Sequence, residues 1–342
     1  MRTKILSLGL LLVVCLSVVL FPGPVPAAEV VVWKSGTLVP KGVGYANQIE
    51  NILMPGLAQA TEGQVFLKVY YGGVMGDDED YLKKMRIGQL QGTGTSVQGA
   101  LMVCPEMGAV NLPLMFKNWD EVDYIKKKMY PVFDGVLNDR GFKLILWLDQ
   151  GFDQFYSVKY PLDTMDQFKK ARFVTWCGDI EEQLLSALGA SAIPVNAPEL
   201  NTSLRQGIAD AYIGPPIWAL STQMYSVVRY ISALDVRYSP SVFIITMEAW
   251  EALPPEHQKN IMKSREAWQT DFCLGSRVDN DKCLEAMFKY GVTRVTMDPK
   301  MEEALYEKLR PTWDELAEDE QFPREILDEI IKHLDDYRQG LE

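Results

Sequence analysis

The side chains most often used in catalysis are scarce and isolated in this sequence. The chain of 342 residues has only two histidines, His257 and His333. One lies at a helix start and the other in a charged helix, so we expect both on the solvent-exposed surface. No GxSxG, HExxH, P-loop or GxGxxG spacing occurs in the sequence. The nearest approach to an acid–base pair is Asp149 with Asp153, which leaves a secreted enzyme as one alternative.

Two further segments resemble ligand loops only in composition. Residues 92–95 read GTGT, but the lysine that a phosphate loop needs is missing. Residues 77–80 read DDED, and acidic residues of this kind are favoured at a helix N-terminus. We therefore expect neither a cofactor nor a metal site.

Composition limits the class of protein. Hydrophobic residues make up 47% of the chain and charged residues 23%, which is an ordinary globular ratio and excludes a disordered protein. The formal net charge is −12, from 46 acidic and 34 basic residues, with no basic cluster. Nucleic acid and anionic membrane surfaces are therefore not the expected partners. A scaffold that carries lipid or protein remains a second alternative.

The first 28 residues have the features of a secretory signal peptide. A short basic start precedes the apolar run 5–21, and small residues follow at Ala27 and Ala28. We expect cleavage there and a periplasmic mature protein. A retained anchor, or a lipoprotein that uses Cys15, is the alternative.

The four cysteines beyond that leader are Cys104, Cys177, Cys273 and Cys283. Cys273 and Cys283 fall in one predicted helix about 15 Å apart, which is too far for a disulfide. No CxxC spacing is present. We expect four buried free thiols, with one long-range disulfide as the lesser alternative.

Strands and helices are predicted to alternate along the chain, which indicates an α/β fold. The longest predicted helix covers 254–290 and would reach about 55 Å, enough to cross two lobes. The predicted strands are 30–33, 64–71, 143–148, 155–158, 173–176, 192–195, 211–213 and 242–246. The other predicted helices are 45–61, 78–87, 119–138, 179–188, 199–208 and 220–228, with more helix in 300–341.

An ordered set of motifs resembles the DctP-like solute receptors of tripartite (TRAP-type) transporters. The set begins with YYGGVMGDD at 70–78, MRIGQL at 85–90 and NLPLMF at 111–116. It continues with LGA at 188–190, with Pro194, Glu199, Leu204, Gly207, Asp210 and Pro215, and with Trp250, Leu253, Pro254 and Gln258. This resemblance implies two α/β lobes, joined by crossing strands and one long helix, that close over a ligand. It also implies a receptor that catalyses no reaction and passes its solute to membrane subunits.

The sequence departs from that family where the ligand is usually held. The family's carboxylate-binding arginine aligns with Val174, a second arginine position is occupied by Asp153, and the family asparagine falls on Gly214. A buried carboxylate there would cost several kcal/mol without a cation to offset it. We therefore expect a neutral, largely apolar ligand. A carboxylate held by Arg172 and a cation held by Asp153 are the alternatives.

The resemblance assigns ligand-contact roles and approximate lobes. Residues 29–151 with 239–280 are expected to form lobe I, and 152–238 with 281–342 lobe II. Aromatic side chains there could form apolar walls or a cation–π cage. The expected contact residues are Trp33, Thr95, Ser96, Asp153, Arg172, Val174, Trp176, Tyr212, Gly214 and Trp218. The sequence leaves the ligand's identity and the oligomeric state open.

Overall fold

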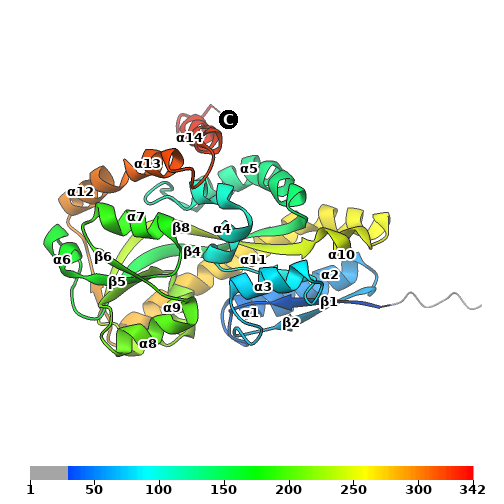
Figure 1. The fold of residues 1–342 in the computed structure, drawn as a ribbon, viewed down its shortest axis with the longest axis horizontal. Coiled ribbons are helices and arrows are strands. Elements are labelled where there is room, and N and C mark those ends of the chain that lie inside the picture. Colours follow the sequence, from blue (N-terminus) through cyan, green and yellow to red (C-terminus); the bar gives the residue numbers. More distant parts are fainter. Residues whose placement is uncertain (1–29, 342) are drawn as a thin grey trace, which may run out of the picture.

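Two long strands run through both halves of the molecule and join them into one sheet. The computed structural model describes residues 30–341. In it β4 (Phe142–Ser157) and β8 (Tyr230–Thr246) lie antiparallel at the centre of the order β2-β1-β3-β8-β4-β7-β5-β6, and β9 also pairs with β8. Figure 1 shows an α/β lobe on either side of this crossing. The predicted two-lobed α/β fold is confirmed.

The first lobe is built on the parallel strands β1 (Val31–Gly36) and β2 (Val65–Tyr70) and on the short β3 (Gly92–Gly94). The helix predicted over 45–61 forms as three consecutive segments. These segments are α1 (Tyr45–Gln48), the π-helical η1 (Ile49–Leu53) and α2 (Met54–Ala60). The other helices of this lobe are α3 (Asp78–Arg86), α4 (Val97–Val103), η2 (Pro105–Val110), α5 (Trp119–Asp139) and α10 (Met247–Glu251).

The second lobe places β7 (Ala211–Gly214), β5 (Arg172–Thr175) and β6 (Ser191–Pro194) beside the carboxyl half of β4. Parallel strands of this kind need helices on their faces. The helices of this lobe are α6 (Met165–Lys170), α7 (Asp179–Ala187), η3 (Ala197–Glu199), α8 (Leu200–Arg205), α9 (Pro216–Ser221), η4 (Met224–Ser226), α12 (Pro299–Leu309) and α13 (Thr312–Glu318). The short strand β9 (Thr293–Val295) pairs with β8.

The prediction of separate strands at 143–148 and 155–158 is wrong, because β4 continues through the polar residues between them. These polar groups are buried, but the neighbouring elements satisfy them. Asp149 accepts hydrogen bonds from Lys126 and Tyr238, and the side-chain oxygen of Gln150 accepts one from the Val97 N–H. A strand can bury such residues when their partners are supplied by tertiary contacts.

The long helix α11 (Pro255–Lys289) is confirmed at 35 residues, which corresponds to about 52 Å. It runs behind both lobes (Figure 1). Gly275 lies in its middle, where a Cβ would come within 2.7 Å of the Gln48 side chain. The glycine therefore permits the close approach of α1 and α11.

The C-terminal helix α14 (Arg324–Arg338) packs on α5. Arg338 donates to both carboxylate oxygens of Glu121, at 2.8 Å each, and the rings of Tyr124 and Tyr337 lie 4.8 Å apart. The tail therefore returns from the second lobe to the helix that covers the first half of β4. The assignment of 281–342 to lobe II and the other lobe boundaries stay predictions.

The predicted leader, residues 1–28, lies outside the described residues. Within 30–341 no helix has the length and apolar character needed to cross a bilayer. The four cysteines of this range are free thiols, and Cys283 is half-buried rather than buried. His257 is also buried and His333 half-buried, so the expectation of two exposed histidines is wrong.

Candidate functional site

Four aromatic rings line the second lobe's side of the boundary between the lobes. Tyr156 on β4 and Tyr212 on β7 are register partners, and their rings stack 4.5 Å apart. Trp176, just after β5, stacks on Trp218 of α9 at 5.7 Å and donates its indole N–H to the Ile213 carbonyl. The carboxyl ends of two parallel strands thus deliver aromatic faces to the place where ligands bind in open α/β sheets.

Next to these rings lies a fully buried group of three charged side chains, Arg237, Asp153 and Glu181. Arg237 on β8 donates from Nε to Asp153 on β4 at 2.7 Å and from Nη2 to Glu181 on α7. None of the three side chains is exposed to solvent. We call these residues the charged triad.

The triad carries one cation and two carboxylates. Burial raises the pKa of Asp153 and of Glu181, although Arg237 acts in the opposite direction on both. Burial alone would lower the pKa of Arg237, but Glu181 and Asp153 reverse this effect, so the guanidinium stays charged. With both carboxylates ionised the triad carries a net charge of −1, and with one of them protonated it is neutral.

Several buried polar atoms around the triad and the rings have no hydrogen-bond partner in the described chain. The donors are Nη1 of Arg237 and Nε1 of Trp218, and the acceptors are Oδ1 of Asp153 and Oε1 of Glu181. The hydroxyl groups of Tyr156 and Tyr212 are also unpaired, and burial raises the pKa of both phenols. Buried polar atoms are normally paired. A concentration of unpaired ones at a lobe boundary indicates a site completed by something else.

Two adjoining cavities of about 250 and 300 Å³ form the mouth of this boundary. Both contain Gln98 of α4 on one side and Gly178, before α7, on the other. Trp176 lines one of them and Cys177 lines the other. In Figure 1, α4 lies beside the β5–α7 region. The mouth therefore reaches Trp176, which stacks on Trp218.

The two lobes touch on either side of the mouth. A Cβ on Gly108 of η2 would lie 2.8 Å from Cδ1 of Ile180 on α7, and one on Gly44 would lie 2.4 Å from Cδ1 of Ile217 on α9. Gly44 also has a positive φ of 51°, which glycine adopts without strain. The structure is therefore a closed arrangement of the lobes.

The structure brings together most of the residues expected at the site. Asp153, Trp176, Tyr212 and Trp218 surround one region, as described above. Val174 is fully buried in the core beside them, and a Cβ on Gly214 would meet the Tyr212 ring at 3.3 Å.

Thr95 and Ser96 lie near the mouth, but their side chains are used in the fold. Thr95 Oγ1 accepts from the Val242 N–H at 3.2 Å. Ser96 donates its hydroxyl to Asp78 and accepts from the Gly99 N–H as the N-cap of α4. These residues fix the turn that carries Gln98.

Two of the expected contact residues lie elsewhere. Trp33 is fully buried in the first lobe's core with Leu53 and Leu67. Arg172 lies at the opposite end of β5 from Trp176, and its guanidinium donates to Asp210 at 2.9 and 3.0 Å and to the Gly207 carbonyl. Core packing and a surface ion pair thus engage these two side chains away from the aromatic rings, and their contact with a ligand stays a prediction.

Sequence reasoning missed Arg237 and Glu181. Glu181 follows Asp179 at a helix start and resembles ordinary N-terminal acidic capping. Arg237, however, stands in an extended apolar segment between Val236 and Tyr238, all three of which are buried. A single arginine in such a strand requires a buried anion, and this signal was available in the sequence.

Comparisons with known proteins agree with this architecture. The family described as "Bacterial extracellular solute-binding protein, family 7" matches residues 51–320. A "C4-dicarboxylate-binding periplasmic protein DctP" of Rhodobacter capsulatus is 27% identical over 86% of this chain and 89% of its own length. A "Solute-binding protein" of Chromohalobacter salexigens is 23% identical over 84% of this chain and 85% of its own.

Solved structures share the fold at low sequence identity. The sugar acid binding protein DctPAm from Advenella mimigardefordensis, in complex with galactonate, superimposes with a TM-score of 0.84 at 18% identity, covering 91% of this chain and 99% of that one. A TRAP periplasmic solute binding protein from Chromohalobacter salexigens with bound D-glucuronate gives 0.81 at 21% identity, covering 89% and 99%.

Proposed function

The chain belongs to the bacterial extracellular solute-binding proteins of family 7, the DctP-like receptors of TRAP transporters, and we propose that the solute it binds is uncharged. It is a solute receptor and not an enzyme. The proposed site is the lobe boundary formed by the four aromatic rings and the charged triad. Closure of the lobes over the solute would be driven by the solute's higher affinity for the closed state.

The observation that carries the proposal is the charge of the triad. Arg237 is the cation of that buried group, and two carboxylates already share it. An arriving carboxylate would have to lose its hydration beside a group with no surplus positive charge. Burial of a charge without a partner is strongly unfavourable. An uncharged solute does not incur that cost.

The unpaired polar atoms refine the expected solute. A fully apolar molecule would leave both the donors and the acceptors at the site without partners, at about 1–3 kcal/mol each. A solute with a flat apolar face and an edge carrying hydroxyl or amide groups would satisfy both kinds of atom. The apolar face would lie against Trp176 and Trp218.

A carboxylate solute is the second candidate function. Two unpaired donors, Nη1 of Arg237 and Nε1 of Trp218, favour it. The ligands bound in the two structural neighbours named above are acids, galactonate and D-glucuronate. The unpaired acceptors Asp153 Oδ1 and Glu181 Oε1 count against this candidate and would suit a cation instead.

Calorimetric titration with matched pairs of solutes tests the proposal. Each pair shares one skeleton and differs in charge, such as galactose with galactonate, or succinamide with succinate, and choline supplies a cation. We expect binding from uncharged members and none from their carboxylate counterparts. Tight binding of a carboxylate with no response to its neutral counterpart would refute the proposal.

We also propose that the mature protein is periplasmic and delivers its solute to the membrane subunits of a TRAP transporter. The leader-like residues 1–28 and the family membership support this location. N-terminal sequencing of the protein from a periplasmic fraction should give a start near Ala28 or Glu29. Recovery of chains that retain the leader in the membrane fraction would contradict it.

A further inference from the structure

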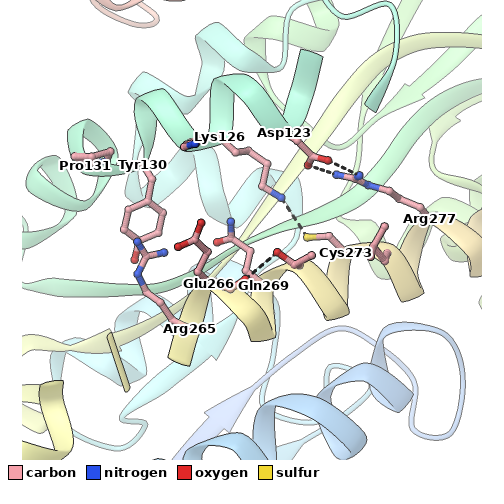
Figure 2. A pocket seen from close by; sticks show the side chains of 12 residues that line it. Asp123, Lys126, Tyr130, Pro131, Arg265, Glu266, Gln269, Cys273 and Arg277 are labelled. Atoms are coloured by element: carbon pink, nitrogen blue, oxygen red, sulfur yellow. Dashed lines mark hydrogen bonds and ion pairs between the residues drawn. The ribbon is translucent and has the colours of Figure 1, made fainter. Parts of the chain in front are cut away.

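A second charged cavity lies away from the mouth between the lobes. It is next to β4 and α11, which run through both lobes and which we call the hinge. It has a volume of about 400 Å³ and is formed by α5 and the middle of α11 (Figure 2). We call it the hinge cavity. Nothing in the proposed function uses it.

Cationic side chains outnumber acidic ones in the cavity wall. Lys126, Lys127, Arg265 and Arg277 face Asp123 and Glu266, in a chain whose net charge is −12. Arg277 is paired with two carboxylates, Asp123 and Asp149. The remaining cations are therefore the ones available to a ligand.

Lys126 is a buried ammonium at the base of the cavity. Its Nζ donates to Asp149 at 2.7 Å and to the sulfur of Cys273 at 3.2 Å, so one of its three N–H donors remains. Burial lowers the pKa of Lys126, but the charges and hydrogen bonds of Asp149 and Cys273 together outweigh this effect, and the net shift is upward. The amine therefore stays protonated.

Arg265 provides a second cation with a hydrogen-bond donor left for a ligand. Its guanidinium lies on the Tyr130 ring, 3.4 Å from the ring centre, and its buried Nε has no hydrogen-bond partner in the described chain. Gln269 uses its carbonyl oxygen to accept from the Trp147 N–H, which leaves its amide N–H₂ as a further donor. In Figure 2 the Lys126 ammonium points toward Cys273 and the Arg265 guanidinium lies at Tyr130, with the side chains of Glu266 and Gln269 between them.

We propose that the hinge cavity binds a small oxyanion, such as phosphate or a low-molecular-weight carboxylate, through Lys126, Arg265 and Gln269. Charge-assisted hydrogen bonds of this kind are among the strongest available to a polar site. The anion would connect α5 to α11, the helix that spans both lobes. It would also lie behind Asp149, next to the irregularity of β4 between Asp149 and Gly151.

The test is titration of the whole mature protein with sodium phosphate and with sodium acetate, against sodium chloride at constant ionic strength. Isothermal calorimetry and ³¹P line broadening report binding. The variant is Arg265→Gln, which removes the unpaired cation without breaking a carboxylate pair. The matched control is Arg86→Gln, at an exposed arginine of α3.

We expect saturable phosphate or acetate binding that Arg265→Gln weakens by about tenfold or more and Arg86→Gln leaves unchanged. Trp176→Ala should also leave it unchanged, since that residue lines the mouth between the lobes and not this cavity. Absence of binding beyond the chloride response would overturn the proposal. So would equal binding by the wild type and Arg265→Gln, while loss of binding in Trp176→Ala would move the anion to the lobe boundary.

Discussion

At the scale of single residues, the proposed solute preference depends on the charged triad at the lobe boundary. Two carboxylates and one guanidinium share a volume without solvent, so the electrostatic state of the site depends on each of them. Glu181 reaches the triad from a helix, whereas Asp153 and Arg237 are register partners on β4 and β8. Removal of Glu181's charge would therefore change the solute preference while the strand pair stays intact.

Glu181→Gln should shift the solute preference of the site toward carboxylates. The triad would then contain one carboxylate for one guanidinium, and the Nη1 donor of Arg237 would meet a carboxylate solute without net repulsion. We expect at least tenfold tighter carboxylate binding by calorimetry, since a charge-assisted bond contributes about 1.5–3 kcal/mol. Glu303→Gln, at an exposed position of α12, is the control. Unchanged preference in Glu181→Gln would contradict the electrostatic account.

Arg237→Met should strongly destabilise the fold. It leaves the buried Asp153 and Glu181 without their cation, which typically costs about 3–5 kcal/mol. Urea unfolding measures the loss. It should be larger at pH 8 than at pH 5, because the variant's buried carboxyls can be neutralised only by taking up protons. The control is Arg294→Met, which breaks the exposed pair with Glu285 and should cost less than about 1 kcal/mol. Equal losses in the two variants would show that the triad has no special role in stability.

Asp78 should make the wild-type protein less stable as the pH rises from about 4 to 6. Burial raises the pKa of this carboxyl to about 6, although hydrogen bonds from Ser96 lower it. In this range the folded chain retains a proton that the unfolded chain has released, so the unfolding free energy falls by roughly 3 kcal/mol. Asp78→Asn should remove this slope, measured by urea unfolding at each pH, whereas the exposed Asp120→Asn should keep it. Parallel profiles for the wild type and Asp78→Asn would exclude Asp78 as the source.

At the scale of elements, the parts with strong local signals were predictable. The Asp77 N-cap of α3, the acidic first turn that follows it and the long α11 all form as the sequence indicated. The continuity of β4 was not predictable, because Asp149, Gln150 and Asp153 look like loop residues until Lys126, Val97 and Arg237 are placed beside them. Local patterns contain no information on partners that are distant in the chain.

Contacts between elements of the two lobes should control closure. Gly108 of η2 packs against Ile180 of α7, and a larger side chain there would act as a wedge. Gly108→Leu should populate an open form with a larger radius of gyration by small-angle scattering and at least tenfold weaker solute binding. The control Gly135→Leu places the same side chain on α5, where a Cβ meets nothing within 4 Å. If both variants close normally on solute, the Gly108 contact is not part of closure.

At the scale of the whole molecule, the family resemblance predicted the architecture, while the site was predicted only in part. Export signals, motif order and a helix of about 50 Å all pointed to a two-lobed receptor. Trp33 and Arg172 were grouped with the site because an aromatic ring and an arginine fit a ligand site, a core or a surface pair equally well in sequence. Arg237 was missed although an arginine between Val236 and Tyr238 was visible in the sequence, because its anionic partners Asp153 and Glu181 are distant in the chain.

The central claim is that the solute is uncharged. Its most direct test is native mass spectrometry of the protein purified from a periplasmic fraction of its host. Denaturation of the complex should release the solute that the cleft retained, and high-resolution mass analysis then identifies it. The account predicts an uncharged molecule with an apolar face and hydrogen-bonding groups at its edge. Release of a carboxylate that competes at the lobe boundary would contradict it, since the triad would then have to accommodate an additional negative charge.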